Sequence, residues 1–224
     1  MTGGVRLMKH GIDISYAQGE ADIGRLRGQV DFIIIRAGYG GFASQRDEYF
    51  ERNYSLCKRY KIPCGAYWFA YARNGQEAQQ EAKACIEVIK GKRFEYPIYY
   101  DVEGQALQGG RDTVSSMCRS FCDALEKAGY FAGIYMSADP LENMLDTQVR
   151  KRYAIWAAQY GGRLDYSGFT GMWQDSCSGR LPGISGSVDT DICYEDYPAI
   201  IKKAHLNGYK KRKRKKGGQE IKKQ

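Results

Sequence analysis

Histidine is scarce in this chain of 224 residues: only His10 and His205 occur, each near one end of the expected domain. Neither lies near a serine in a Gly-x-Ser-x-Gly turn, which disfavours Ser-His-Asp or Cys-His catalysis. The seven cysteines include no Cys-x-x-Cys pair. We therefore expect no metal site and no cofactor, and we interpret the cysteines as small buried side chains of a chain that folds reduced.

Long apolar runs are also missing. No window approaches the roughly 18 consecutive apolar residues of a membrane span, and the start MTGGVRLMKHG lacks the apolar stretch of a secretory signal peptide. No Gly-x-Gly-x-x-Gly follows a predicted strand, which disfavours a dinucleotide site. The sequence thus predicts no membrane span and no export by an N-terminal signal.

Basic residues are concentrated at one end. The formal net charge is +8, but nine of the 34 lysines and arginines follow residue 209, together with one of the 26 acids. Residues 1–209 therefore hold 25 basic and 25 acidic side chains. We expect one folded domain over residues 9–206 and a basic, disordered tail over residues 207–224, because that composition cannot bury a core.

Short apolar runs alternate with longer amphipathic ones. Five strand-then-helix units followed by three more strands favour an α/β fold, a single-domain TIM-like barrel of parallel strands that becomes irregular near its end. A doubly wound open sheet is the alternative. The predicted strands cover residues 11–15, 32–37, 65–71, 97–102, 131–136, 153–158, 171–174 and 188–193, and the predicted helices cover 47–60, 76–90, 112–128, 139–150 and 195–206.

Acidic residues occur on three of these strands. Asp13 lies in the first, Asp101 and Glu103 end the fourth, and Asp189 and Asp191 lie in the eighth. Side chains alternate along a strand, so Asp101 and Glu103 point to the same side, about 7 Å apart. Two carboxyls held close in a poorly hydrated cleft raise one pKa and keep one acid neutral near pH 7. A neutral acid is what protonation of a glycosidic oxygen requires.

These acids also allow a purely structural interpretation. A lone Asp-x-Glu is most often a solvated loop pair or a salt-bridge partner, and Asp13 could equally cap a strand end. The strand context and the acids on two further strands favour a site. We interpret Asp191 as a turn or cap residue and favour Asp189 as the site acid. Tyrosines outnumber phenylalanines by 18 to 8, which suits a wet cleft where rings stack on sugar C–H faces.

Several segments resemble a known family. They are HGIDISYAQG (10–19), FIIIRAGYG (32–40), CGAYWFAYA (64–72), YYDVEG (99–104), IWAAQYGG (155–162) and MWQDSCSGRLPGISGSVDTDIC (172–193). Together they are similar to the family 25 glycoside hydrolases, the Chalaropsis-type lysozymes, over about residues 9–206. The combination of the Asp-x-Glu, the opening GIDIS and the closing Trp-Gln and Gly-x-Val-Asp is fairly specific.

The resemblance implies a (β/α)5(β)3 barrel that hydrolyses the β-1,4 bond from N-acetylmuramic acid to N-acetylglucosamine in peptidoglycan, without metal or cofactor. By motif position, Glu103 corresponds to the general acid and Asp101 to its partner. Asp13 and Asp189 correspond to the other two acids of the site. The candidates for the sugar-lining wall are Tyr67, Phe69, Tyr135 and Trp173.

Two residues depart from the family pattern. Asp175 follows Trp-Gln where an aromatic is common, and Asp191 stands where the family often has Asn. The mechanism stays open between retention, inversion and neighbouring-group participation by the substrate's acetamido oxygen, which we favour. A non-catalytic cell-wall glycan-binding module on the same fold is the alternative function.

The expected partners are glycan strands of peptidoglycan at the bacterial cell wall, with the protein acting as a monomer. Without a signal peptide, the protein could stay in the cytoplasm until released, as a phage or prophage lysin, or be exported by another route. The basic tail could attach electrostatically to anionic wall polymers, could be solvated without a partner, or could attract nucleic acid. The neutral body disfavours a specific nucleic-acid-binding protein.

Overall fold

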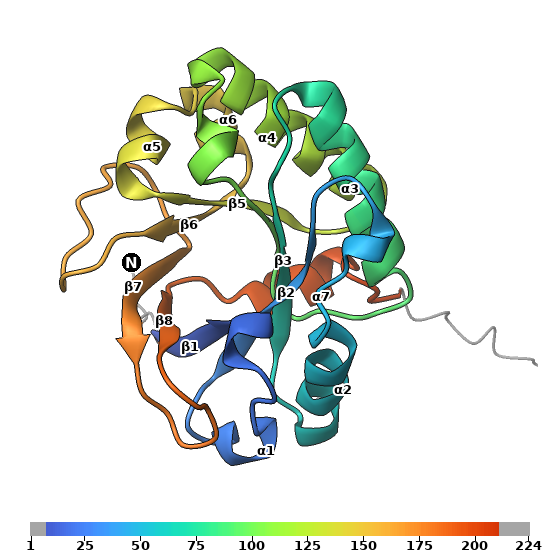
Figure 1. Cartoon of the computed structure of the whole chain (residues 1–224), viewed down its shortest axis with the longest axis vertical. Helices are drawn as coiled ribbons and strands as arrows, with labels where there is room; N and C mark the ends of the chain where they lie inside the picture. The colour runs from blue at the N-terminus through green and yellow to red at the C-terminus, as the bar shows by residue number, and fades with distance from the viewer. Residues whose placement is uncertain (1–7, 211–224) are drawn as a thin grey trace, which may run out of the picture.

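The computed structural model describes residues 8–210, and its eight strands form one closed barrel in chain order (Figure 1). Each strand coincides with one of the eight predicted from the apolar runs, so the predicted barrel is confirmed and the open sheet is excluded. The strands are β1 (Lys9–Ile14), β2 (Phe32–Tyr39), β3 (Cys64–Phe69), β4 (Ile98–Asp101), β5 (Ala132–Ser137), β6 (Ala154–Ala158), β7 (Met172–Gly179) and β8 (Val188–Cys193).

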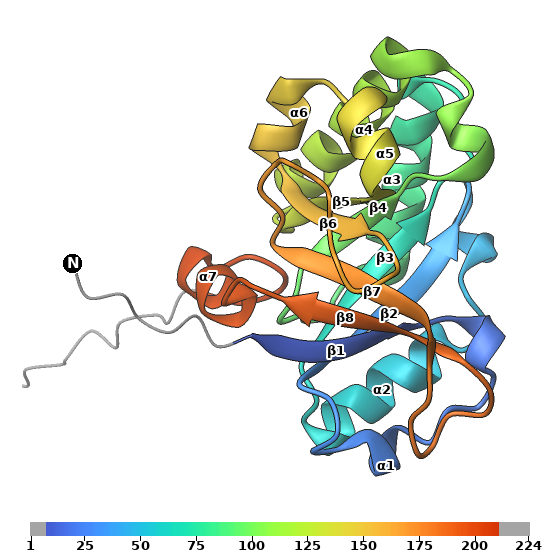
Figure 2. The ribbon, with the colours of Figure 1, turned by 90° about the vertical axis from the view of Figure 1, so that its left-hand side faces the viewer.

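The last strand departs from the expected parallel arrangement. Pairing is parallel from β1 through β7, whereas β8 runs antiparallel to both β7 and β1. In Figure 2 the arrowhead of β8 points opposite to those of β2 and β3. No helix lies between β7 and β8, and a connection without a crossover helix allows the next strand to return antiparallel. The beginning of β8 therefore lies beside the end of β1.

Helices cover the outside of β2 to β6. One predicted helix, over 139–150, is instead two short helices, because the Asp146 carboxylate caps a new helix by accepting from the backbone N–H of Val149 at 2.9 Å. The helices are α1 (Ile23–Leu26), which the sequence did not predict, α2 (Phe50–Tyr60), α3 (Gly75–Ile89), α4 (Gly110–Lys127), α5 (Ala138–Asn143), α6 (Thr147–Arg152) and α7 (Tyr197–Ala204).

The core has two layers, as strand alternation requires. Aliphatic side chains such as Ile12 and Ile33 point outward and pack under the helices. Inside the barrel, rings such as Phe32, Tyr99 and Trp156 fill the interior. Gly133 leaves room for one of them, since a Cβ there would lie 2.5 Å from the Tyr99 ring. The interior of the barrel is thus a packed core.

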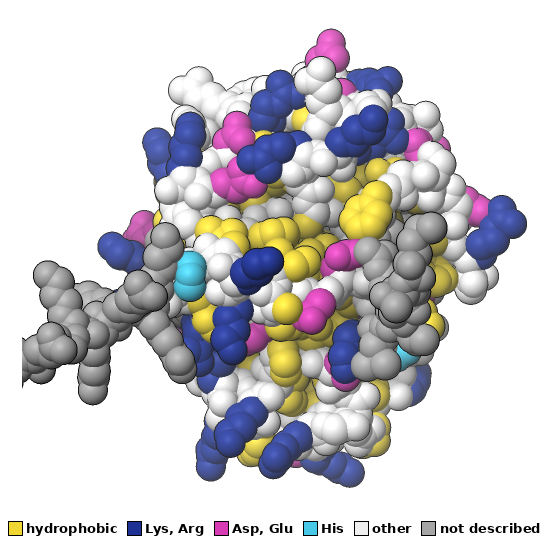
Figure 3. All heavy atoms as spheres, turned by 180° about the vertical axis from the view of Figure 1, so that it is seen from behind, with side chains coloured by type: hydrophobic (Ala, Val, Ile, Leu, Met, Phe, Trp, Pro, Cys, Tyr) yellow, Lys and Arg dark blue, Asp and Glu magenta, His cyan; other side chains and the backbone are white. Residues whose placement is uncertain are grey.

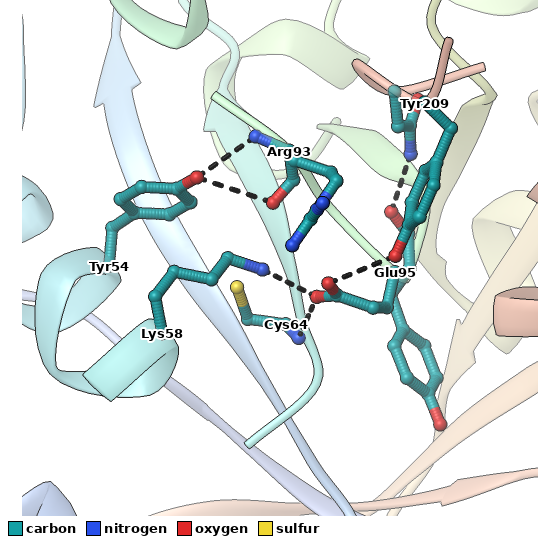
Figure 4. A network of polar contacts seen from close by, with 8 residues as sticks. Tyr54, Lys58, Cys64, Arg93, Glu95 and Tyr209 are labelled. Carbon is teal, nitrogen blue, oxygen red and sulfur yellow. Dashed lines mark hydrogen bonds and ion pairs between the residues drawn. The ribbon is translucent and has the colours of Figure 1, made fainter. Parts of the chain in front are cut away.

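A polar network closes the end of the barrel where β1 begins (Figure 4). The Glu95 carboxylate accepts from Lys58 Nζ at 2.5 Å, from the Cys64 backbone N–H at 3.1 Å and from the Tyr209 hydroxyl at 3.1 Å. The buried Asn207 side chain donates to the Tyr96 carbonyl at 2.8 Å. The folded domain therefore extends past the expected boundary at residue 206, because Asn207 and Tyr209 are bonded to it.

The rest of the predicted basic tail, residues 211–224, lies outside the described residues. Its expected attachment to anionic polymers stays a prediction. In the part of the chain that the structure describes, no helix combines the length and apolar character needed to cross a membrane.

Candidate active site

Four of the predicted site acids meet at the end of the barrel where β1 to β7 end. Asp13 and Asp189 are paired in the register of β1 and β8, so the reversal of β8 places the start of one strand beside the end of the other. Asp101 is the last residue of β4, and Glu103 follows two residues later in extended backbone (φ −148°, ψ 176°). The strand alternation thus continues through Glu103, and both side chains turn to the barrel axis.

The intervening residues confirm this orientation. Tyr100 points outward, where its ring stacks on Phe121 at 3.9 Å and its hydroxyl donates to the buried Glu81 carboxylate at 2.5 Å. Val102 is likewise buried in the outer layer of the core. The two acids on either side are therefore held by a rigid strand whose opposite face is fully packed.

Electrostatic repulsion and burial make these four acids reluctant to ionise. Burial raises the pKa of Asp13 to about 8, and the Asp189 carboxyl adds to the rise. The pKa of Asp101 is raised well above its ordinary value, first by burial and then by Glu103 and Asp13. Burial followed by repulsion from Asp189 also raises the pKa of Glu103. The cluster can therefore keep protons at a pH where isolated carboxyls have lost them.

A buried glutamine connects the acids to two tyrosines. Gln174 on β7, only 2% exposed, donates from Nε2 to Asp13 at 2.7 Å and to Asp189 at 3.4 Å. Its Oε1 accepts from the Tyr135 hydroxyl at 2.8 Å and from the Tyr160 hydroxyl at 2.9 Å. The amide orientation is fixed because carboxylates accept and tyrosine hydroxyls can donate. The Asp13 side chain is thereby held in one position.

Three of the four predicted aromatic residues face this cluster. Tyr67 points into the barrel, where Asp13 and Asp101 are near enough to raise its pKa further after burial. Tyr135 reaches Gln174, and Phe69 lies beside Asp101 in the register of β3 and β4. Trp173 is not brought together with them: it alternates with Gln174 on β7, and its indole N–H donates to the Gln159 carbonyl at 2.8 Å.

Sequence reasoning missed two contributors to this site. Gln174 stands in the Trp-Gln pair of the resemblance, and its signal is a polar side chain at an inward-facing position of an otherwise buried strand. Arg36 lies inward on β2, where its guanidinium opposes the rise in the pKa of Asp101. Gln174 and Arg36 belong to the site only because they lie on the inward faces of their strands. Which face of a strand points inward is settled only when the barrel closes.

The interpretation of Asp191 as a turn or cap residue is wrong. Asp191 lies within β8, buried in the barrel beneath the four acids, and its Oδ1 accepts from Trp156 Nε1 at 2.8 Å. Its Oδ2 is buried without a hydrogen-bond partner among the described residues. Burial, and next repulsion from Asp13, raise the pKa of Asp191 well above its ordinary value.

We expect Asp191→Asn to stabilise the protein more at pH 7.5 than at pH 4.5. The folded state holds a proton on Asp191 that the unfolded chain releases above its ordinary pKa near 4, so this residue lowers stability as the pH rises. Asparagine keeps an oxygen for Trp156 and has no such proton to lose. The melting temperature should rise by roughly 2–6 °C at pH 7.5, with only a mild loss of turnover. Asp175→Asn, on the opposite face of β7, is the control. An equal gain at both pH values would contradict the assignment.

Over residues 8–210, no group of three or more His, Cys, Asp or Glu side chains is placed to hold a metal ion. The site offers carboxyls with raised pKa values beside the buried rings of Tyr67 and Tyr135 and the partly exposed ring of Phe69.

Comparison with known proteins assigns the family. Residues 12–184 match the family model of glycosyl hydrolases family 25, and the chain belongs to that family. It is 30% identical over 190 residues to an autolytic lysozyme of Clostridium acetobutylicum, covering 81% of this chain and 54% of the relative. The chain thus spans about half the length of that relative.

Solved structures agree with this assignment. The modular autolysin LytC of Streptococcus pneumoniae, solved in complex with a synthetic peptidoglycan ligand, has a TM-score of 0.76 and 29% identity, covering 85% of this chain and 48% of its own. The CTP1L endolysin has a TM-score of 0.77 and 27% identity, covering 87% of this chain and 70% of its own.

Proposed function

We propose that this chain is a lysozyme of the muramidase type, which hydrolyses the β-1,4 bond between N-acetylmuramic acid and N-acetylglucosamine in peptidoglycan at the bacterial cell wall. The observation that carries the proposal is the convergence of four carboxyls with raised pKa values at one end of the barrel. The names of its relatives, an autolytic lysozyme and an autolysin solved with a peptidoglycan ligand, support the same substrate.

In this proposal Glu103 is the general acid. It is half-buried, so it can both hold a proton and reach a bound glycan, whereas Asp101 is almost fully buried behind it. Glu103 transfers its proton to the glycosidic oxygen as the C1–O bond breaks, and the leaving sugar departs with a free hydroxyl. Glu103 then accepts a proton from the water that completes hydrolysis.

Asp101 acts as the partner that orients the reacting sugar. Its Oδ1 is buried and has no hydrogen-bond partner among residues 8–210. An acetamido N–H of the substrate would donate to it, which favours the charged form of Asp101 and shifts the shared proton toward Glu103. The acetamido oxygen then attacks C1 from the opposite face, and a cyclic oxazolinium carries the positive charge beside Asp101. Asp13 and Asp189 complete the wall of the site.

The bond that is cut can be read from the new reducing end. Purified protein is incubated with peptidoglycan, the fragments are reduced with borohydride, and mass spectrometry identifies the reduced sugar. We expect the alditol of N-acetylmuramic acid. The alditol of N-acetylglucosamine would refute the proposed bond. Sedimentation with the wall without any released fragment would favour the non-catalytic glycan-binding module. Proton NMR of the first product separates the mechanisms, and initial inversion at C1 excludes the neighbouring-group route.

A further inference from the structure

Tyr160 is a half-exposed side chain beside the buried acids, and the chemistry proposed above assigns it no role. Its exposed fraction is 50%, whereas that of Tyr135 is 7%. It follows β6, in which Trp156 and Ala158 point into the barrel. Because side chains alternate, Tyr160 continues this inward face next to Gln174, which pairs with Ala158 in the register of β6 and β7. Tyr160 therefore approaches Gln174 from the solvent side.

The loop that carries Tyr160 is closed by its own side chains. Gln159 Nε2 donates to the Asp165 carboxylate, and the Asp165 backbone N–H donates to Gln159 Oε1, both at 2.7 Å. Gly161 and Gly162 turn the chain with φ values of 116° and 82°, in the region that favours glycine. The backbone on both sides of Tyr160 is thus held in place.

All four hydrogen-bonding positions of the Gln174 amide are filled. Its nitrogen donates to Asp13 at 2.7 Å and to Asp189 at 3.4 Å. Its oxygen accepts from the Tyr135 hydroxyl at 2.8 Å and from the Tyr160 hydroxyl at 2.9 Å. A side-chain amide has two N–H donors and two lone pairs on its oxygen, so no further partner is needed.

Rotation of this amide by 180° would exchange its nitrogen and its oxygen. The oxygen would then face Asp13 and Asp189, and it would repel a carboxylate that carries no proton. The nitrogen would face the two tyrosine hydroxyls, whose oxygens can also accept. The rotated amide therefore suits a protonated Asp13, and the present one suits an ionised Asp13. The number of hydroxyls that donate to the amide oxygen sets the balance between the two.

The Tyr160 hydroxyl keeps the proton that it donates. Burial, followed by repulsion from Asp189, raises the pKa of Tyr160 to about 12. Burial raises the pKa of Asp13 to about 8, and the hydrogen bond from Gln174 opposes that rise. Loss of the Tyr160 hydroxyl should therefore make Asp13 harder to ionise, because the Gln174 nitrogen is less firmly directed toward it.

We propose that Tyr160 is a positioning residue, whose hydroxyl holds the Gln174 amide with its nitrogen toward Asp13. In this orientation the amide donates to an ionised carboxylate, so Tyr160 favours the charged form of Asp13 by acting through Gln174. The inference deepens the muramidase function proposed above and rests on it, because Asp13 belongs to the wall of that site.

Other ionisable groups around Asp13 come from β3, β4, β5 and β8, and they are Tyr67, Asp101, Glu103, Tyr135, Asp189 and Asp191. Arg36 on β2 opposes the rise that burial causes in the pKa of Tyr67. Cys177 on β7 adds to the rise in the pKa of Tyr160. Each of these groups is retained in Tyr160→Phe, so a change in the titration of Asp13 reports the missing hydroxyl.

The opposite end of the molecule provides a matched control hydroxyl. Figure 3 shows this face, where hydrophobic side chains gather across the middle. A cavity of about 630 Å³ there is lined in part by Tyr153, which precedes β6. Its hydroxyl donates to Asp123 Oδ1 at 2.6 Å. Tyr153→Phe therefore removes a donating hydroxyl without touching Gln174.

The test follows the Asp13 carboxyl by carbon-13 NMR in protein labelled at its aspartate side chains, with Asp13→Asn to assign the resonance. In Tyr160→Phe the titration midpoint of Asp13 should move to higher pH by about 0.5 or more. On soluble glycan fragments kcat should fall by about 3–10-fold with KM nearly unchanged, because the ring remains and its hydroxyl is already engaged. Tyr153→Phe should leave the midpoint and both constants unchanged.

A double variant tests the route of the effect. In a Gln174→Leu background, Tyr160→Phe should no longer move the midpoint of Asp13, because the hydroxyl acts only through the amide. A movement that persists there would mean that Tyr160 acts on Asp13 directly, which overturns the proposal.

The remaining outcomes are equally decisive. An unmoved midpoint in folded Tyr160→Phe overturns the positioning role, and a raised KM with an unmoved midpoint assigns the hydroxyl to substrate binding instead. The titration needs no substrate, so its result is separate from the fate of the muramidase proposal. Failure of the wild-type protein to cleave peptidoglycan would remove the proposed function while leaving the measured link from Tyr160 to Asp13 in place.

Discussion

Glu103→Gln is expected to lower kcat on peptidoglycan by about 10³-fold while the melting temperature changes by less than about 2 °C. Glutamine has the size and polarity of a protonated glutamate but cannot release a proton to the leaving oxygen. Glu103 is half-buried and caps no helix through its side chain, so the fold should tolerate the change. Release of reducing ends and a thermal melt measure the two effects separately.

The matched control for this variant is Glu20→Gln, an exposed acid in the loop after β1. It should retain wild-type turnover. In the wild-type protein, activity should decline on the alkaline side as Glu103 loses its proton, at a pH above the ordinary carboxyl range because burial and Asp189 raise its pKa. Near-normal turnover by Glu103→Gln would transfer the acid role to another carboxyl of the cluster.

Gln174→Leu is expected to reduce both stability and turnover. The substitution leaves the buried Tyr135 hydroxyl and the Asp13 carboxyl without the partners they have at 2.8 Å and 2.7 Å. Buried polar groups that lose a partner each cost about 1–3 kcal/mol. For a domain of this size, we expect the melting temperature to fall by roughly 4–24 °C. Turnover should fall as well, because Asp13 is no longer held in one orientation.

Gln174→Glu separates this positioning role from simple packing. The glutamate keeps the shape and the oxygen that accepts from the tyrosines, but when ionised it places a further negative charge against Asp13 and Asp189. Its folded pKa should be raised, so the variant should approach wild-type stability at pH 4.5 and lose it as the pH rises. Gln80→Leu, an exposed glutamine on α3, is the control. Equal stability of Gln174→Glu at pH 4.5 and 8 would contradict the network.

These variants test one physical idea, that carboxyls at this end of the barrel have raised pKa values and so keep their protons. Asp13, Asp101 and Asp191 are almost fully buried, and Glu103 and Asp189 are partly buried beside them. Complete ionisation would place five negative charges in one poorly hydrated region. Some of these carboxyls must therefore stay neutral, and Glu103 and Asp189 are the two among them that combine a raised pKa with access to solvent.

Local patterns in the sequence were enough to predict the strands and the orientation of Asp101 and Glu103. Apolar runs and side-chain alternation are properties of neighbouring residues, so they can be read without knowing the fold. The resemblance to family 25 added the expected roles of the acids. The boundary at residue 206 was inaccurate, because Asn207 is hydrogen-bonded to Tyr96 and Phe131, which precede β4 and β5. The single helix over 139–150 was inaccurate, because Asp146 caps a new helix.

The amino-acid sequence by itself determined the eight strands, the acids they carry and the family of the chain. Only the tertiary structure decided the direction of β8, which sets Asp189 beside Asp13, and the burial of Asp191 against Trp156. It also decided the hydrogen bond from Gln174 to Asp13 and the cavity that Arg36 helps to line. The physical reason is that each of these contacts joins residues far apart in the chain, and closure of the barrel alone specifies which strand faces meet.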